Sequence, residues 1–219
     1  MKTICYLLLS FILFFPASPA AAATAAPLVI GQFSADDLSG WQSKEFLGQT
    51  EYRLISLDDR RVLQAEANAS ASGLFKEIEI DLKATPFLNW EWMLQKALPP
   101  LQETTKAGDD YGARIYVVVK GGLLFWKTRA LNYVWSSSQP RESVWPNAFA
   151  GKNAMLLAVR TAEDDTNRWY REKRNVYQEL KEIFGEEIRT IDAIAIMTDS
   201  DNSKGTTRAV YGDIFFSAD

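Results

Sequence analysis

The chain has 219 residues, 47% apolar and 24% charged, which is typical of a globular protein and excludes a disordered one. It contains no His and a single Cys, Cys5, which excludes a Ser-His-Asp triad, a Cys-His pair, a His-ligated zinc site and a haem-binding His. The net charge of −4, without a basic run, argues against nucleic acid as a partner.

The N-terminus has the layout of a secretory signal peptide. A positive start, Met1 to Thr3, precedes an apolar run from Ile4 to Phe15 and an Ala-rich stretch that ends at Ala26. We expect a signal peptide over residues 1–23, with cleavage between residues 22 and 26 and a periplasmic or secreted protein. The apolar run is shorter than the roughly 20 residues that span a bilayer, so we expect no transmembrane segment in the mature chain.

No linker or repeat divides the mature chain, which predicts a single domain over residues 28–219. Short runs with strand character recur along it, and Leu74 to Leu82 alternates with the period of two that a half-buried strand requires. Gly121-Gly122 predicts a tight hairpin between two of the runs. The expected strands are residues 28–33, 46–57, 61–67, 74–82, 87–94, 111–120, 123–127, 131–136, 155–159, 191–198 and 208–216.

One segment has helical periodicity instead. The apolar residues that share one helical face are Trp169, Val176, Tyr177, Leu180 and Phe184. Asp164 to Thr166 offer N-cap side chains and Gly185 a C-terminal stop, which predicts one amphipathic helix near residues 166–184. Many antiparallel strands with a single late helix predict a mainly β fold, an antiparallel β-sandwich of jelly-roll type.

The segment from Asp199 to Gly205 follows an apolar strand and concentrates oxygen side chains. The candidate ligands for a calcium ion are Asp199, Asp201, Ser203 and Asp213. The loop departs from an EF-hand, because its Gly is one place late and its twelfth position is Val210. The alternative is a polar turn between two strands, with Arg208 as the compensating cation, and both interpretations remain open. We expect no other cofactor.

A second polar group surrounds the strand that begins at Tyr111. Asp109 and Asp110 precede this strand, and Arg114 lies within it, where a buried charge requires a partner. Glu91 lies on the face of its own strand opposite two Trp side chains, so we expect a Glu91–Arg114 ion pair between neighbouring antiparallel strands. Alternatively, the four residues line a cleft for a polar ligand.

The seven Trp residues raise the question of sugar binding, because flat aromatic faces stack on sugar rings. Trp145 is the best candidate for an exposed one, since it lies in a Ser-, Pro-, Gly- and Asn-rich stretch from Ser136 to Asn153. Hydrolysis of a glycoside also remains open, because that chemistry needs only two carboxyl groups and no His.

Several motifs, in fixed order along the chain, resemble a bacterial exported family catalogued as domain of unknown function 3047. They are Trp90-Glu91-Trp92, Asp109 to Val117, Tyr133-Val134-Trp135, Arg174 to Tyr177 with Phe184-Gly185, Ile194 to Asn202, and Tyr211 to Ile214. The resemblance implies an exported sandwich domain. It implies no catalytic residue, because the family has no established activity.

Together these observations favour an exported, non-catalytic domain that binds a ligand, most plausibly a glycan or envelope polysaccharide. The candidate ligand-binding residues are Glu91, Asp109, Asp110, Arg114 and Trp145. Two alternatives are a carboxylate-dependent hydrolase of cell-envelope polysaccharide and a structural envelope protein that binds other proteins. The three differ in what they require of the surface: a groove with exposed aromatics, two convergent carboxylates, or a flat apolar patch.

Overall fold

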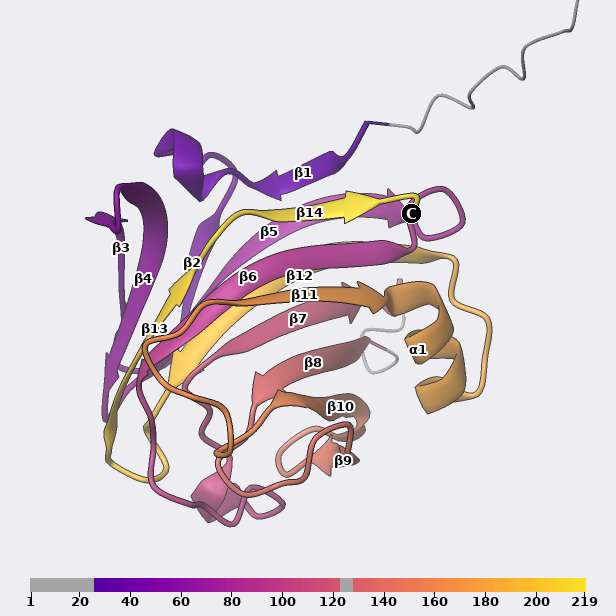
Figure 1. Cartoon of the computed structure of the whole chain (residues 1–219). Helices are drawn as coiled ribbons and strands as arrows, with labels where there is room; N and C mark the ends of the chain where they lie inside the picture. The colour runs from indigo at the N-terminus through magenta and orange to yellow at the C-terminus, as the bar shows by residue number, and fades with distance from the viewer. Residues whose placement is uncertain (1–25, 123–127) are drawn as a thin grey trace, which may run out of the picture.

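The computed structural model describes residues 26–122 and 128–219 (Figure 1). The expected signal peptide and the expected strand at residues 123–127 lie outside the described residues, and so does part of the hairpin expected at Gly121-Gly122. The described residues form mainly β structure, in which two sheets of seven strands face each other. This arrangement confirms the predicted β-sandwich.

The first sheet, sheet A, has the order β1-β14-β6-β13-β4-β3, and β11 also pairs with β6. Its pairs are all antiparallel. The strands are β1 (Leu28–Gly31), β3 (Glu51–Leu57), β4 (Arg60–Asn68), β6 (Phe87–Lys96), β11 (Tyr170–Asn175), β13 (Thr206–Tyr211) and β14 (Ile214–Ser217).

The second sheet, sheet B, has the order β2-β5-β12-β7-β8-β10-β9. Its pairs are antiparallel except for β8 and β10, which run parallel. The strands are β2 (Gln42–Leu47), β5 (Ala71–Asp81), β7 (Arg114–Val119), β8 (Arg129–Trp135), β9 (Val144–Asn147), β10 (Gly151–Arg160) and β12 (Thr190–Asp199).

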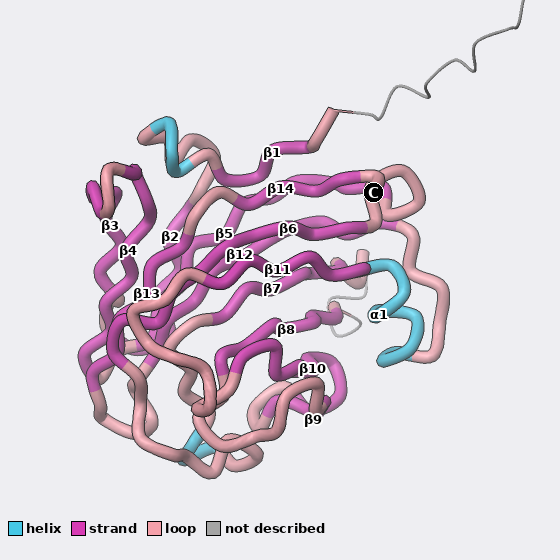
Figure 2. The backbone as a smooth tube through the Cα atoms, viewed as in Figure 1, coloured by secondary structure: helices cyan, strands magenta, loops and turns pink. Residues whose placement is uncertain are grey.

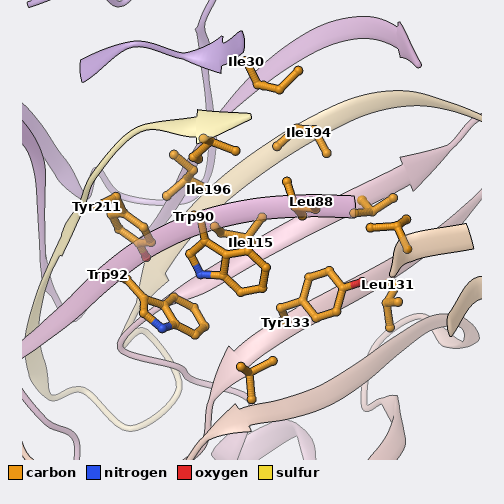
Figure 3. Close-up of a cluster of buried hydrophobic side chains, with 14 of the residues drawn as sticks. Ile30, Leu88, Trp90, Trp92, Ile115, Leu131, Tyr133, Ile194, Ile196 and Tyr211 are labelled. Atoms are coloured by element: carbon orange, nitrogen blue, oxygen red, sulfur yellow. The ribbon is translucent and has the colours of Figure 1, made fainter. Parts of the chain in front are cut away.

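The two sheets bury one large core between their inner faces, as Figure 3 shows for its central part. Trp90 and Trp92 of β6 meet edge to face with their ring centroids 5.4 Å apart, and Trp90 lies 5.2 Å from Tyr133 of β8. The contact between Trp90 and Tyr133 joins the two sheets and buries large aromatic surfaces between them. Along each strand, the side chains that alternate with the buried ones face away from the core.

The predicted helix is present but shorter than expected. Helix α1 spans Val176–Phe184 and covers one end of the sandwich, while Tyr170–Asn175 forms strand β11 (Figure 1). The N-cap is Asn175, whose side chain accepts a 3.0 Å bond from the backbone N–H of Gln178, and not Asp164 to Thr166. Gly185 ends the helix in the left-handed conformation, as predicted.

Two of the expected strands are interrupted. The run 46–57 divides at Gly48 into the end of β2 and the whole of β3, which belong to different sheets. The run 208–216 divides at Gly212, where a side chain would collide with Glu91, since an added Cβ would lie 2.5 Å from its Cγ.

The remaining short elements are two 3-10 helices, η1 (Phe33–Ala35) and η2 (Lys106–Gly108). The second lies within the long loop that joins β6 to β7 at one end of the sandwich (Figure 2). Among residues 26–122 and 128–219, no helix is both long and apolar enough to cross a bilayer.

Candidate functional site

A groove runs along the outer face of sheet B, the face turned away from sheet A. It consists of two adjoining hollows that share Phe46, Tyr116 and Met197. These side chains alternate with residues that point into the core, such as Ile115 and Ile196, so the period of two that builds the core also builds the groove.

One hollow, here called the polar basin, has a volume of about 420 Å³. Its polar lining is Asp109, Arg114, Tyr116, Asn132, Asn147, Asp199, Asp201 and Asn202. Phe46 and Phe149 also line it and are 63% and 58% exposed, respectively. The basin therefore combines a polar lining with aromatic side chains that are open to solvent.

The other hollow, here called the apolar trough, has a volume of about 280 Å³. Its apolar lining includes Phe46, Phe75, Val118, Ala193, Ala195 and Met197. Lys44, Glu77 and Lys120 contribute the charged groups, and Lys120 donates a 2.9 Å bond to Glu77. Small residues on the central strand β12 leave room between the aromatic rings of β2, β5 and β7.

A buried ion pair stands on the basin side of β7. Arg114 pairs with Asp199 of the neighbouring strand β12, and their side chains are only 3% and 2% exposed. Arg114 also donates to the carbonyl of Asp109 at 2.8 Å and to the hydroxyl of Tyr116 at 2.9 Å. The guanidinium thus binds three elements together and neutralises the most deeply buried carboxylate of the groove.

Asp110 organises the loop from Asp199 to Gly205. Its carboxylate accepts bonds from the backbone N–H groups of Asn202 (3.1 Å) and Ser203 (2.6 Å), and from the side-chain amide of Asn202 (3.1 Å). The loop therefore folds around a carboxylate from the preceding β6–β7 connection.

Asp109 positions an exposed aromatic ring through Asn147. Both Asp109 oxygens accept from the Asn147 amide nitrogen, at 3.0 and 2.8 Å. The Asn147 oxygen in turn accepts from the backbone N–H groups of Phe149 (3.0 Å) and Ala150 (2.8 Å). This chain of bonds fixes the turn that places Phe149 at the rim of the basin.

The carboxyl groups of the site differ in their ionisation. Burial raises the pKa of Asp109 and of Asp199, in both cases against the effect of Arg114. Burial and the charge of Asp110 raise the pKa of Asp201. Burial alone would raise the pKa of Asp110 as well. The hydrogen bonds that Asp110 accepts from Ser203 and Asn202 outweigh this effect, and the pKa is lowered. Asp110 is thus the carboxylate that the protein satisfies best.

The predicted Glu91–Arg114 pair is wrong. Glu91 belongs to β6 in sheet A and Arg114 to β7 in sheet B, so the two strands are not neighbours. Glu91 pairs instead with Arg60 and with Arg171, the latter at 3.4 Å, on the outer face of sheet A. Alternation along a strand reveals which residues share a face, but not which sheet the strand joins.

Two further candidates lie away from the basin. Trp145 is not exposed as predicted but 6% exposed, within a small core over β8 and β10. Asp213 accepts bonds of 2.8 and 2.5 Å from the backbone and hydroxyl of Ser34, near Glu91. The loop from Asp199 to Gly205 precedes β13, whereas Asp213 follows the far end of that strand, so the length of β13 separates them.

The remaining carboxylates of the predicted calcium site, Asp199 and Asp201, do converge, together with Asp110, which the prediction did not include as a ligand. One oxygen each from Asp110, Asp199 and Asp201 lies within 4.8 Å of the others. However, Arg114 and the backbone N–H of Tyr111 (3.1 Å) engage Asp199, and Asp110 holds the loop. The hydroxyl of Ser203 accepts a 3.3 Å bond from the Gly205 N–H. Arg114, rather than Arg208, compensates the negative charge here, since Arg208 pairs with Glu66. A calcium ion at these carboxylates stays a prediction, and it would compete with Arg114 for Asp199.

Sequence reasoning missed several residues of the basin, among them Phe46, Tyr116, Asn132, Asn147 and Phe149. Alternation did place Tyr116 beside Arg114 on one face of its strand. Phe46, Asn132 and the turn with Asn147 and Phe149 belong to separate parts of the chain, and the order of strands in sheet B brings them together.

A comparison with known families decides the relationship of the chain. A family model described as protein of unknown function (DUF3047) matches residues 39–215. The chain belongs to this family. The match confirms the resemblance found in the sequence and includes every residue of the basin. No curated protein matches the sequence.

Solved structures resemble the fold only remotely. A xyloglucanase domain of NopAA, a type three effector from Sinorhizobium fredii, aligns with a TM-score of 0.47 and 9% identity over 83% of this chain and 95% of its own. A family 30 carbohydrate-binding module of a Clostridium thermocellum cellulase aligns with a TM-score of 0.46 and 10% identity, over 90% and 95% of the two chains. The likeness concerns the fold alone.

Proposed function

We propose that the protein binds a glycan in the groove of sheet B and catalyses no reaction there. The observation that supports this proposal is the pairing of solvent-exposed aromatic rings, Phe46 and Phe149, with a polar lining between them. A sugar ring has an apolar face and a periphery of hydroxyl groups, so aromatic faces and hydrogen-bonding side chains are the two surfaces that it needs.

The carboxylates favour binding over hydrolysis. A glycosidase needs one carboxyl group free to protonate the leaving group and a second, about 5–9.5 Å away, free to attack or to activate water. In the basin, Asp199 is held by Arg114 and the orientation of Asp109 is fixed by Asn147. Both act here as positioning groups. Asp201, bonded to the Asn202 amide, is then the one carboxylate of the described lining outside such a pairing, and one carboxyl group does not supply the two that hydrolysis needs. We further propose, from the sequence of residues 1–26, that the protein is exported to meet this ligand.

Affinity electrophoresis through gels that contain soluble glucans, mannans or xylans tests the proposal. We expect retardation by at least one polysaccharide, and about tenfold weaker binding after Phe46→Ala or Phe149→Ala. Val144→Ala is the matched control, because Val144 is also exposed (42%) but does not line the groove. Equal losses for the three variants would contradict the proposed site, and no retardation in any gel would contradict the function.

A further inference from the structure

We infer that the polar basin selects an uncharged, hydroxyl-rich glycan and rejects one that carries carboxylates, such as a polyuronate. The inference rests on the proposed function and adds the chemical class of the ligand. Two observations support the inference: the balance of hydrogen-bond donors and acceptors in the basin, and the negative charge of the basin.

Each side-chain donor group that lines the basin already has at least one acceptor within the protein. Arg114 donates to Asp199, Asp109 and Tyr116, and its unpaired Nε atom is buried out of reach of solvent. Tyr116 donates to the sulfur of Met197 at 3.3 Å. The amide nitrogens of the described Asn side chains that line it also have protein acceptors: Met155 O for Asn132, Asp109 for Asn147, and Asp110 for Asn202.

Acceptors, in contrast, remain available. A carboxylate offers about four lone-pair sites. The carboxylate of Asp201 accepts a 3.3 Å bond from the Asn202 amide and also contacts the Asp110 carboxyl group. The carboxylate of Asp109 accepts from the Asn147 nitrogen and from Tyr111. Each therefore has fewer partners than lone-pair sites. Both carboxylates line the basin, so a ligand that occupies it must bring donors. Sugar hydroxyls are donors, whereas a carboxylate or a phosphate brings only more acceptors.

The charge of the basin points the same way. Arg114 and Asp199 compensate each other, which leaves Asp109 and Asp201 as a negative surface. The positive groups of the groove, Lys44 and Lys120, lie at the apolar trough, where Lys120 already pairs with Glu77. A polyuronate carries a carboxylate on every ring, so a ring that occupies the basin brings its carboxylate close to Asp109 and Asp201.

Matched oligosaccharides test the inference. Cellohexaose, mannohexaose and maltohexaose are each compared by calorimetry with a counterpart whose C6 hydroxyls are oxidised to carboxylates. We expect the neutral form of the hexamer that binds to bind at least about tenfold tighter, and the difference to shrink as salt screens the charges. Asp201→Asn should reduce the discrimination to about threefold, because it removes one of the two charges.

Glu163→Gln is the control, since Glu163 is an exposed carboxylate outside the groove, and it should leave the discrimination unchanged. Equal or tighter binding of an oxidised hexamer would overturn the inference and leave the proposed function standing. Equal effects of Asp201→Asn and Glu163→Gln on the discrimination would also overturn the inference and leave the proposed function standing. Failure of all six hexamers to bind would overturn the proposed function, and the inference with it.

Discussion

Arg114 is the residue on which the basin depends most. Its side chain is buried between two strands and pairs with an equally buried Asp199. Removing one partner of such a pair leaves the other charge without compensation in a medium that solvates it poorly.

We therefore expect Arg114→Met to lower the free energy of unfolding by roughly 3–5 kcal/mol, measured by urea denaturation. Arg208→Met is the matched control, because Arg208 forms a partly exposed pair with Glu66 and should cost no more than about 1 kcal/mol. The double variant Arg114→Met with Asp199→Leu should recover part of the loss. If the two single losses simply add, the pair is not the cause.

Asp201 should behave oppositely, because its ionised form is unfavourable in the folded chain. Burial and the charge of Asp110 raise its pKa above the ordinary value of 3.8. Its favourable contribution is thus present below pH 3.8 and is lost as the pH rises through its higher folded-state pKa.

Asp201→Asn should accordingly raise the free energy of unfolding at neutral pH, by less than about 1 kcal/mol because solvent screens this partly exposed charge. The gain should vanish below the ordinary pKa, where Asp201 is protonated in both states. Thermal melts of the wild type and the variant, at neutral pH and at a pH below the ordinary pKa of Asp, measure this difference in stability. A calcium site would give a different result: calcium would raise the melting temperature of the wild type, and Asp201→Asn would abolish that rise.

At the scale of elements, α1 shows where sequence periodicity fails. The residues before it, Tyr170–Asn175, alternate in exposure as a strand and contribute nothing to the predicted helical face, which reaches back across them only through Trp169. The longer pattern favoured a helix from residue 166, whereas pairing with β6 makes the first part a strand. The pairing of these residues with β6 thus outweighs the helical periodicity of the wider segment.

Mutation of the N-cap residue distinguishes the observed start of α1, after Asn175, from the start that the sequence predicts near residue 166. Asn175→Ala should destabilise the protein by about 1 kcal/mol, because it removes the acceptor of the Gln178 N–H. Thr166→Ala, at the cap that the sequence predicts, should have little effect, since Thr166 is exposed and lies outside α1. Chemical denaturation of the two variants provides the measurement, and a larger loss for Thr166→Ala would contradict the observed boundary.

Strands with a regular alternation of buried and exposed residues could be predicted from the sequence. From Leu74 onward, only one face of β5 is buried, the face that carries Leu74 and Ile80, so apolar and polar residues alternate along this part of its sequence. The alternation carries no information on neighbours, which explains why Glu91 and Arg114 were paired wrongly. The acidic members of the basin were found because they lie at strand ends in sequence clusters, while Phe46 and Phe149 are isolated in the chain.

For the whole molecule, export is the prediction that depends least on the fold. The positive start, apolar run and Ala-rich stretch of residues 1–26 predict removal of about 22–26 residues. The intact mass of protein purified from its native host measures this directly. A full-length mass in the periplasmic or extracellular fraction would contradict cleavage.

The pairing of β1 with β14 has a consequence for how the chain folds. Leu28 lies opposite Phe216, so sheet A is completed by joining the first strand to the last. The contact joins segments near the two ends of the described domain, and contacts of such large sequence separation slow folding. A growing chain cannot form this contact until β14 has been synthesised. Strand β1 therefore has no partner while the intervening strands are made, and we expect this edge of sheet A to form last.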